Sequence, residues 1–236
     1  MKIAICDDEK VFVDMLVEYI TPYKETYPSI DVTTYFSGEE ILEAYSEGEK
    51  VDIIFFDIKM AQIDGITVAQ KIRIEDENVI IFFATSHTDF VPEAFRLGAF
   101  QFFSKPVKKE DFDKDFERAI KKYELSKKVY EVKFKNETYV FFYQDIYYIE
   151  SIGRHLELCD GNSKVKYIGN ISELEKTFEK YNFVRCHQSF IVNMRYIKGV
   201  GKEELFLTNG ESIPISRRMR IKVLDKFNKY IAGGGL

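Results

Sequence analysis

The chain has 236 residues, 45% hydrophobic and 31% charged, a composition typical of soluble globular proteins. No apolar run approaches the roughly 20 residues of a membrane-spanning helix, so we expect no membrane segment. Acidic residues begin at Asp7, too early for a secretory signal, and we expect a cytoplasmic protein. Cys6, Cys159 and Cys186 form no CxxC pair, which argues against a disulfide framework.

The net charge of -5 is distributed unevenly. Residues 1–120 contain 13 Lys and Arg against 25 Asp and Glu, a net charge of -12, and residues 121–236 contain 21 against 14, a net charge of +7. This asymmetry indicates an acidic module joined to one with an anionic partner.

The first half alternates short apolar strands with amphipathic helical patterns. The predicted strands are Lys2–Cys6, Ile30–Phe36, Ile53–Phe56, Val79–Ala84 and Ala99–Phe103. Helical patterns follow each strand, and the last of them reaches Tyr123. Five such alternations predict an α/β domain with a doubly wound, five-stranded parallel sheet of the flavodoxin-like kind.

Polar side chains stand where these strands end. The expected set is Asp7, Asp8, Asp57, Thr85 and Lys105. The carboxyl ends of parallel strands share one edge, where ligands bind. Three converging carboxylates repel one another unless a cation joins them, and oxygen ligands favour Mg²⁺. An added hydroxyl and ammonium suit a phosphoryl group.

Residues 1–123, with these side chains on successive strand ends, resemble a response-regulator receiver domain. The resemblance implies that a partner sensor histidine kinase phosphorylates Asp57. It also implies direct Mg²⁺ ligation by Asp8 and Asp57, with the Lys59 carbonyl as a further ligand and Asp7 helping through water.

The same resemblance assigns Thr85 and Lys105 to the phosphoryl oxygens. It implies a cis peptide between Lys105 and Pro106, and it makes Phe102 the aromatic switch residue. Simple core packing is an equally good interpretation of Phe102 taken alone.

A phosphohydrolase that forms an aspartyl-phosphate is the enzymatic alternative. Such enzymes of the haloacid dehalogenase type place a second Asp two residues after the nucleophile, and this chain has Lys59 there. We therefore expect a protein that is not an enzyme.

The second half changes to the period-two pattern of strands after a short charged linker, residues 124–128. We expect a mainly β domain over residues 129–236, with one helix beginning near Ser172 and a basic helix from Arg217 to about Tyr230. Hairpins are predicted around residues 135–137 and at the turn pairs Asp160-Gly161 and Asn209-Gly210. Strands are also predicted over Asp145–Ser151 and in the region Phe183–Val192.

Composition alone indicates a basic β module that binds an anionic polymer. Its most specific segments are Asp145–Glu150, Gly169–Ile171, Phe183–Asn193 and Ile213–Arg217, which together resemble a LytTR-type DNA-binding domain of the LytR/AgrA-like family.

The resemblance implies that loops enter successive major grooves of DNA and that His155, Gln188 and Arg217 read bases. Arg suits guanine and Gln suits adenine. His187, Ser189, Arg218 and Arg220 are the expected contacts to the DNA backbone. For each residue alone, a solvated or capping role is the simpler interpretation.

Together these patterns predict a transcription regulator of a two-component system. A kinase phosphorylates Asp57, the receiver domain dimerises, and the LytTR domains bind promoter DNA. The alternative is a constitutive or peptide-gated DNA-binding protein whose receiver domain serves only as a dimerisation scaffold.

Overall fold

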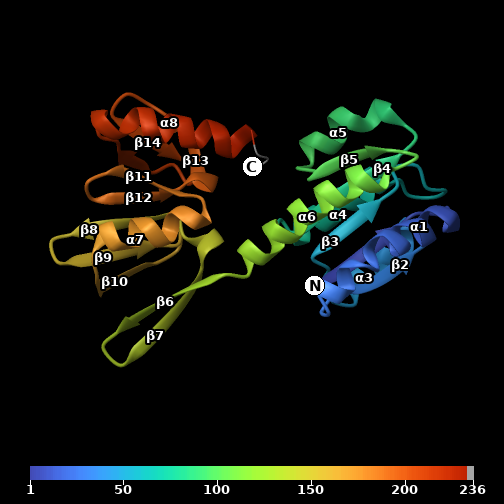
Figure 1. Cartoon of the computed structure of the whole chain (residues 1–236), viewed down its shortest axis with the longest axis horizontal. Helices are drawn as coiled ribbons and strands as arrows, with labels where there is room; N and C mark the ends of the chain where they lie inside the picture. Colours follow the sequence, from blue (N-terminus) through green and yellow to red (C-terminus); the bar gives the residue numbers. More distant parts are fainter. Residues whose placement is uncertain (233–236) are drawn as a thin grey trace. The chain divides into compact units, whose positions relative to one another are not determined.

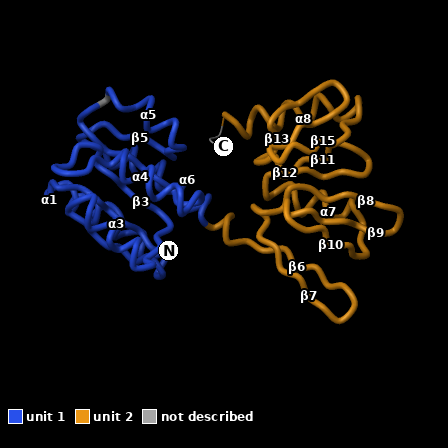
Figure 2. The backbone as a smooth tube through the Cα atoms, turned by 180° about the vertical axis from the view of Figure 1, so that it is seen from behind, with its two compact units in different colours: residues 1–123 blue, residues 124–236 orange. Residues whose placement is uncertain are grey.

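The structure, a computed structural model, describes residues 1–232 and all of their side chains except that of Thr88. Residues 233–236, the end of the predicted C-terminal domain, lie outside the described residues. The chain divides into two compact units, residues 1–123 (unit 1) and the residues from 124 onward (unit 2). Figure 1 follows the chain through its elements, and Figure 2 colours the two units separately.

Unit 1 contains a five-stranded sheet in the order β2-β1-β3-β4-β5, and every neighbouring pair is parallel. The predicted doubly wound parallel sheet is therefore confirmed. The strands are β1 Lys2–Cys6, β2 Asp31–Tyr35, β3 Ile53–Phe56, β4 Ile80–Thr85 and β5 Gln101–Ser104. The helices are α1 Lys10–Ile20, α2 Tyr23–Thr26, α3 Gly38–Ser46, α4 Gly65–Glu75, α5 Val91–Arg96 and α6 Lys109–Ser126. A 3₁₀ turn, Thr88–Phe90, precedes α5.

Two of these helices begin at N-cap residues whose side chains accept a hydrogen bond from the first helical turn. The Ser37 hydroxyl accepts a hydrogen bond from the Glu40 N–H at 3.2 Å, at the start of α3. The Asp64 carboxylate accepts one from the Thr67 N–H at 2.8 Å, at the start of α4. Each bond satisfies a backbone donor that the first helical turn leaves free.

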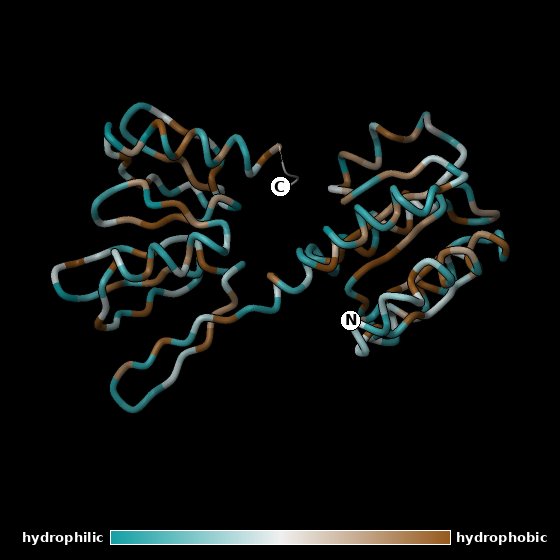
Figure 3. The backbone as a smooth tube through the Cα atoms, in the orientation of Figure 1, coloured by the Kyte–Doolittle hydropathy of each residue, from teal (hydrophilic) through white to brown (hydrophobic). Residues whose placement is uncertain are grey.

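The central strands of the unit 1 sheet are apolar on both faces, because their successive residues point to opposite sides and are nearly all hydrophobic. All four residues of β3 are buried, and Figure 3 shows β3 as hydrophobic along its length. Ile53 and Phe55 face α1 and α6, whereas Ile54 and Phe56 face the side of α3 and α4.

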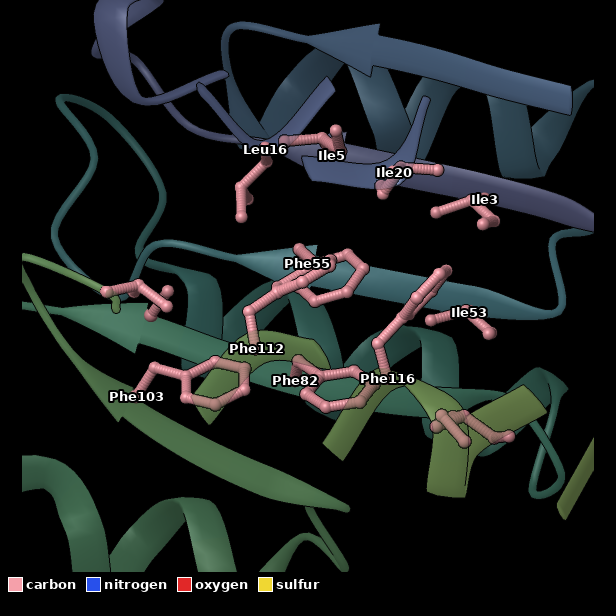
Figure 4. Close-up of a cluster of buried hydrophobic side chains, with 14 of the residues drawn as sticks. Ile3, Ile5, Leu16, Ile20, Ile53, Phe55, Phe82, Phe103, Phe112 and Phe116 are labelled. Carbon is pink, nitrogen blue, oxygen red and sulfur yellow. The ribbon is translucent and has the colours of Figure 1, made fainter. Parts of the chain in front are cut away.

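A cluster of phenylalanines fills the core between the sheet and α6 (Figure 4). The ring of Phe55 stacks on that of Phe82, with centroids 4.6 Å apart, and lies 5.6 Å from that of Phe112. Phe112 in turn stacks on Phe116 at 5.1 Å. These residues are almost completely buried, so the cluster fixes α6 against the centre of the sheet.

Unit 2 is mainly β, as predicted. Its five-stranded sheet has the order β10-β9-β8-β12-β11, and a three-stranded sheet, β13-β14-β15, and a hairpin, β6-β7, accompany it. The strands are β6 Val129–Phe134, β7 Glu137–Phe142, β8 Tyr148–Ile152, β9 His155–Cys159, β10 Lys164–Ile168, β11 Phe183–His187, β12 Phe190–Asn193, β13 Ile197–Val200, β14 Glu204–Leu207 and β15 Ser212–Pro214. The helices are α7 Ile171–Phe178 and α8 Arg217–Ala232. Further 3₁₀ turns are Tyr143–Asp145, Glu179–Tyr181 and Met194–Tyr196.

The five-stranded sheet of unit 2 separates two cores. One core packs side chains such as Val192 against β14 and α8, which contributes Val223. The other packs side chains such as Ile191 against α7 and the β6-β7 hairpin. Sheet residues therefore contribute to both cores.

Three local expectations for unit 2 were wrong or incomplete. The strand predicted from Asp145 begins only at Tyr148, because residues 143–145 form a 3₁₀ turn. The Asn193 side-chain amide donates to the Tyr143 carbonyl in this turn at 3.3 Å and to the Ile146 carbonyl just after it at 3.0 Å. The predicted strand region Phe183–Val192 is confirmed as β structure, but it consists of two antiparallel strands joined by a turn that was not predicted. Strand β13 had no predicted counterpart.

The end of α6 and the start of β6 border the predicted linker. Helix α6 continues to Ser126, so residues 124–126 are helical, and β6 begins at Val129.

Among residues 1–232, no helix is long and apolar enough to cross a membrane.

The phenylalanine cluster leads to a stability prediction. Phe112→Ala should lower the free energy of unfolding of unit 1 by about 3–5 kcal/mol, because a fully buried ring leaves a cavity. Phe95→Ala is the matched control: its side chain is 61% exposed, and its removal should change stability by no more than about 0.5 kcal/mol. Urea titration with hydrogen exchange read at the β3 and β4 amides would measure both. Equal effects of the two substitutions would contradict the packing described here.

Candidate functional site

Four strands of unit 1 end at one edge of the sheet and deliver the predicted polar residues there. Asp7 follows β1, Asp57 follows β3, Thr85 ends β4 and Lys105 follows β5. Backbone hydrogen bonds fix neighbours to each other, from the Asp57 N–H to the Cys6 carbonyl at 3.0 Å and from the Lys105 N–H to the Thr85 carbonyl at 3.0 Å. The parallel sheet thus brings together residues up to about 100 positions apart in the sequence.

The three predicted carboxylates converge. Asp7, Asp8 and Asp57 each offer an oxygen, and these oxygens lie within 4.8 Å of one another. Asp7 and Asp57 are buried and Asp8 is exposed. The cluster is therefore anchored in the protein and open to solvent on the side of Asp8.

Lys105 is the cation that faces this cluster. Its Nζ atom lies 2.8 Å from Asp7 Oδ2, 3.8 Å from Asp57 Oδ1 and 3.7 Å from Glu9 Oε1. The lysine side chain is only 8% exposed, and its ammonium lies 4.2 Å from the centre of the Phe12 ring. The sequence motif did not indicate Glu9 or Phe12, although both lie within a few residues of Asp8.

One lysine does not offset the burial of two carboxylates. Burial raises the pKa of Asp7 to about 6, although Lys105 and the Glu9 N–H act in the opposite direction. Burial also raises the pKa of Asp57, against the opposing effects of Lys105 and the Thr85 hydroxyl. The charged forms of both groups are thus destabilised by loss of water.

The pocket has the donor set of a hard divalent cation. Asp7 Oδ2 and Asp57 Oδ1 are buried, and apart from their ion pairs with Lys105 they have no hydrogen-bond partner among the described residues. Oxygen-only ligands with an opening to water are what Mg²⁺ requires. The residues present therefore fit this ion.

The remaining predicted receiver residues surround the carboxylates less directly. Thr85 is fully buried, and its hydroxyl accepts a hydrogen bond from the His87 N–H at 3.3 Å. Lys59 is exposed, with its ammonium 5.1 Å from the centre of the Phe90 ring. Phe102 is half-buried and packs against the core on the α4 side. The expected cis peptide between Lys105 and Pro106 is confirmed.

In unit 2, the three predicted base-reading residues come from loops at one edge. The β8-β9 turn precedes His155, the β11-β12 turn contains Gln188, and α8 begins at Arg217. The Ser151 N–H donates to the Ser189 carbonyl at 2.8 Å, and the Ser216 N–H donates to the Cys186 carbonyl at 2.9 Å. Figures 1 and 2 both show these three loops on the same side of unit 2.

These side chains differ in how free they are. Gln188 is exposed and His155 is half-buried. The Arg217 side chain is 90% exposed and lies 3.5 Å from Glu203, a weak surface ion pair. Arg217 and Gln188 are therefore accessible to a partner.

The four predicted backbone contacts divide in the same way. Arg218 is exposed and Ser189 is half-buried, whereas Arg220 donates from Nε to the Gly201 carbonyl at 2.9 Å. His187 Nδ1 accepts from the Ser189 N–H at 3.2 Å. Arg220 and His187 thus already have structural partners.

Cys186 is buried, which raises the pKa of its thiol to about 12.

Comparison with known proteins agrees with both halves of this description. Residues 3–117 match the response regulator receiver domain, and residues 136–228 match the LytTr DNA-binding domain. The transcriptional regulatory protein NatR of Bacillus subtilis is 26% identical over 237 residues, which cover 98% of this chain and 99% of NatR. The sensory transduction protein LytT of Oceanobacillus iheyensis is 31% identical over 198 residues, covering 77% of this chain and 80% of LytT. The response regulatory domain of protein mrkE from Klebsiella pneumoniae superposes with a TM-score of 0.48 at 26% identity, covering 52% of this chain and 98% of that domain.

A carboxylate pocket on a five-stranded parallel sheet, followed by a mainly β DNA-binding module, defines the class of response regulators that control transcription. Within that class, the chain belongs to the two-component response regulators that join a receiver domain to a LytTR domain.

Gly65 gives a test of how tightly the pocket is built. A Cβ atom on this first residue of α4 would lie 2.0 Å from the Asp57 carbonyl oxygen. Gly65→Ala should therefore destabilise unit 1 by about 1–3 kcal/mol through overpacking, although Gly→Ala in a helix is normally stabilising. In Gly199→Ala, the added carbon would make only an ordinary contact, 3.7 Å from Phe206. Thermal unfolding of both variants measures the difference, and a neutral Gly65→Ala would show that the Asp57 loop yields freely.

Proposed function

We propose that the chain is a phosphorylation-controlled transcription regulator in which Asp57 accepts a phosphoryl group from a partner sensor histidine kinase. The observation that carries this proposal is the convergence of three carboxylates and Lys105 at one sheet edge. We assign residues 1–123 to the receiver domain, 124–128 to the linker and 129–236 to the LytTR domain.

The pocket residues divide the chemistry among them. Asp7, Asp8, Asp57 and the carbonyl of Lys59 would hold Mg²⁺, which shields the charge of the incoming phosphoryl oxygens. A carboxylate oxygen of Asp57 attacks phosphorus, the bond from phosphorus to the kinase histidine breaks, and the imidazole leaves with the electron pair. Lys105 and the Thr85 hydroxyl bind the phosphoryl oxygens.

Phosphorylation changes the charge balance around Thr85. The phosphoryl group adds about -1.5 to -2 charges and three acceptor oxygens, which compete for Lys105 and the Thr85 hydroxyl. Movement of Thr85 toward the phosphoryl group would open space for Phe102 to turn inward, and homodimerisation would follow.

In the LytTR domain, His155, Gln188 and Arg217 read base edges of double-stranded promoter DNA. Arg217 is the strongest candidate, because its guanidinium is exposed and can engage guanine through two parallel hydrogen bonds. Arg218, Arg220, His187 and Ser189 contact the DNA backbone. The excess of basic residues after residue 120 supports binding to a polyanion.

Replacement of the acceptor tests the first half of the proposal. Asp57→Asn should abolish phosphorylation by acetyl phosphate and Mg²⁺, since an amide cannot form the acyl phosphate. Asp64→Asn is the matched control, because Asn also caps a helix and the rest of the pocket is untouched. Intact-protein mass spectrometry reads the added phosphoryl group. A phosphorylated Asp57→Asn protein would refute the assignment, as would loss of phosphorylation in both variants.

Two adjacent arginines test the second half. Arg217→Ala should cost about 1–3 kcal/mol of binding to the preferred duplex and remove discrimination at one base pair. Arg218→Ala should weaken all duplexes alike and reduce the slope of log affinity against log salt by about one. Binding titrations on single-base variants at several salt concentrations separate the two. If Arg217→Ala changes only the salt slope, Arg217 holds the DNA backbone instead.

A further inference from the structure

The turn that presents Gln188 is built without the usual turn residues. Strands β11 and β12 are joined through Gln188 and Ser189, and neither is the Gly, Asn or Asp that tight hairpins favour. The strand register also shifts between Arg185 and His187, which interrupts the ladder just before the turn. Side-chain contacts therefore help to hold the turn, among them the hydrogen bond from the Ser189 N–H to His187 Nδ1 at 3.2 Å.

The Arg185 guanidinium also binds this turn, through hydrogen bonds to its carbonyls. Its Nε donates to the His187 carbonyl at 3.2 Å, and its Nη2 donates to the Gln188 carbonyl at 2.6 Å. Two consecutive carbonyls of the turn are thus bound by one planar, charged group. A lysine could not reproduce this, since its ammonium lacks the flat fork of N–H donors.

The other side of the same guanidinium is anchored on α7. Nη1 of Arg185 donates to Ser172 Oγ at 3.0 Å and to Glu175 Oε2 at 3.2 Å. Only 12% of the Arg185 side chain is exposed, and its charge is already matched by Glu175. These contacts leave Arg185 poorly suited to contact a DNA phosphate itself.

Glu175 also links this turn to the start of α8. Its Oε1 atom lies 3.4 Å from the ammonium of Lys222, which is in the second turn of the helix that begins at Arg217. One carboxylate on α7 therefore pairs with Arg185 in β11 and with Lys222, five residues after Arg217 in α8. Glu175 thus connects the strand that leads into the Gln188 turn to the helix that begins at Arg217.

We propose that Arg185, braced by Glu175, is a positioning residue that sets the base specificity of Gln188 without touching DNA. The inference rests on the proposed function, because it takes Gln188 to read a base. Side chains that read base edges need a backbone held within a fraction of an ångström, so release of the two turn carbonyls should reduce discrimination more than affinity.

The experiment compares four variants of the full chain in the presence of Mg²⁺ and acetyl phosphate. The probe is a duplex selected from a random-sequence pool by the wild-type chain, together with all of its single-base variants. Gln188→Ala locates the base pair that Gln188 reads. Arg185→Lys keeps the charge and removes the fork, and Glu175→Gln keeps the shape and removes the anionic brace. Arg195→Lys is the control, because this arginine lies beyond the other end of β12.

Arg185→Lys should lower discrimination about tenfold at the base pair that Gln188→Ala identifies, with other positions and the salt slope unchanged. Glu175→Gln should produce a smaller loss, about threefold, at the same position. Arg195→Lys should discriminate like the wild type. Circular dichroism checks folding, and if Arg185→Lys does not fold, the result for Glu175→Gln decides.

Three results would overturn the inference, and they are distinguishable. If Gln188→Ala removes discrimination at one base pair but Arg185→Lys and Glu175→Gln retain it, the positioning role is wrong and the proposed function stands. A uniform loss of affinity on all duplexes in Arg185→Lys would likewise reduce Arg185 to a stabilising residue. If Gln188→Ala changes no position, base reading by Gln188 fails and the positioning role fails with it.

Discussion

Two buried carboxylates beside one buried lysine are the constraint on which unit 1 depends. Asp7 and Asp57 meet because β1 and β3 are neighbours in the sheet, and Lys105 reaches them because β5 ends at the same edge. Such a cluster costs free energy unless further charge or hydrogen bonding compensates it. The apolar packing on both faces of the sheet supplies the rigid frame that keeps these groups together, and the exposed Asp8 leaves the cluster open to a cation and a phosphoryl group.

In unit 2, hydrogen bonds and ion pairs hold several loops in a fixed arrangement relative to one another. Main-chain hydrogen bonds join Ser151 near the end of β8 to Ser189 in the β11-β12 turn, and Ser216 just before α8 to Cys186 in β11. Ion pairs from Glu175 reach Arg185 and Lys222, so charged side chains connect α7 to β11 and to α8. The segments that present the exposed Gln188 and Arg217 are thus held by hydrogen bonds and ion pairs to the rest of unit 2.

The sequence was most informative where residue pattern and chain topology coincide. The parallel sheet followed from short apolar runs, and the pocket residues followed from the ends of those runs, because parallel strands must share their carboxyl edge. Side-chain bonds between distant segments could not be predicted in this way. Arg185 binds two carbonyls of the β11-β12 turn, which carries no turn signature in the sequence. Asn193, far along the chain, binds the Tyr143 and Ile146 carbonyls that precede β8. The ion-pair partners of Lys105 beyond the motif, such as Glu9, also appear only in the folded chain.

We propose that Asp7, Asp8 and Asp57 form one Mg²⁺ site, and calorimetric titration of Mg²⁺ into the purified chain tests this most directly. The wild type should bind one ion per chain, and Asp8→Asn, which removes a proposed charged ligand at an exposed position, should bind it at least about tenfold more weakly. Glu9→Gln removes a neighbouring acid that is not a proposed ligand and should bind Mg²⁺ like the wild type. Equal Mg²⁺ affinity in the wild type and Asp8→Asn would contradict the account.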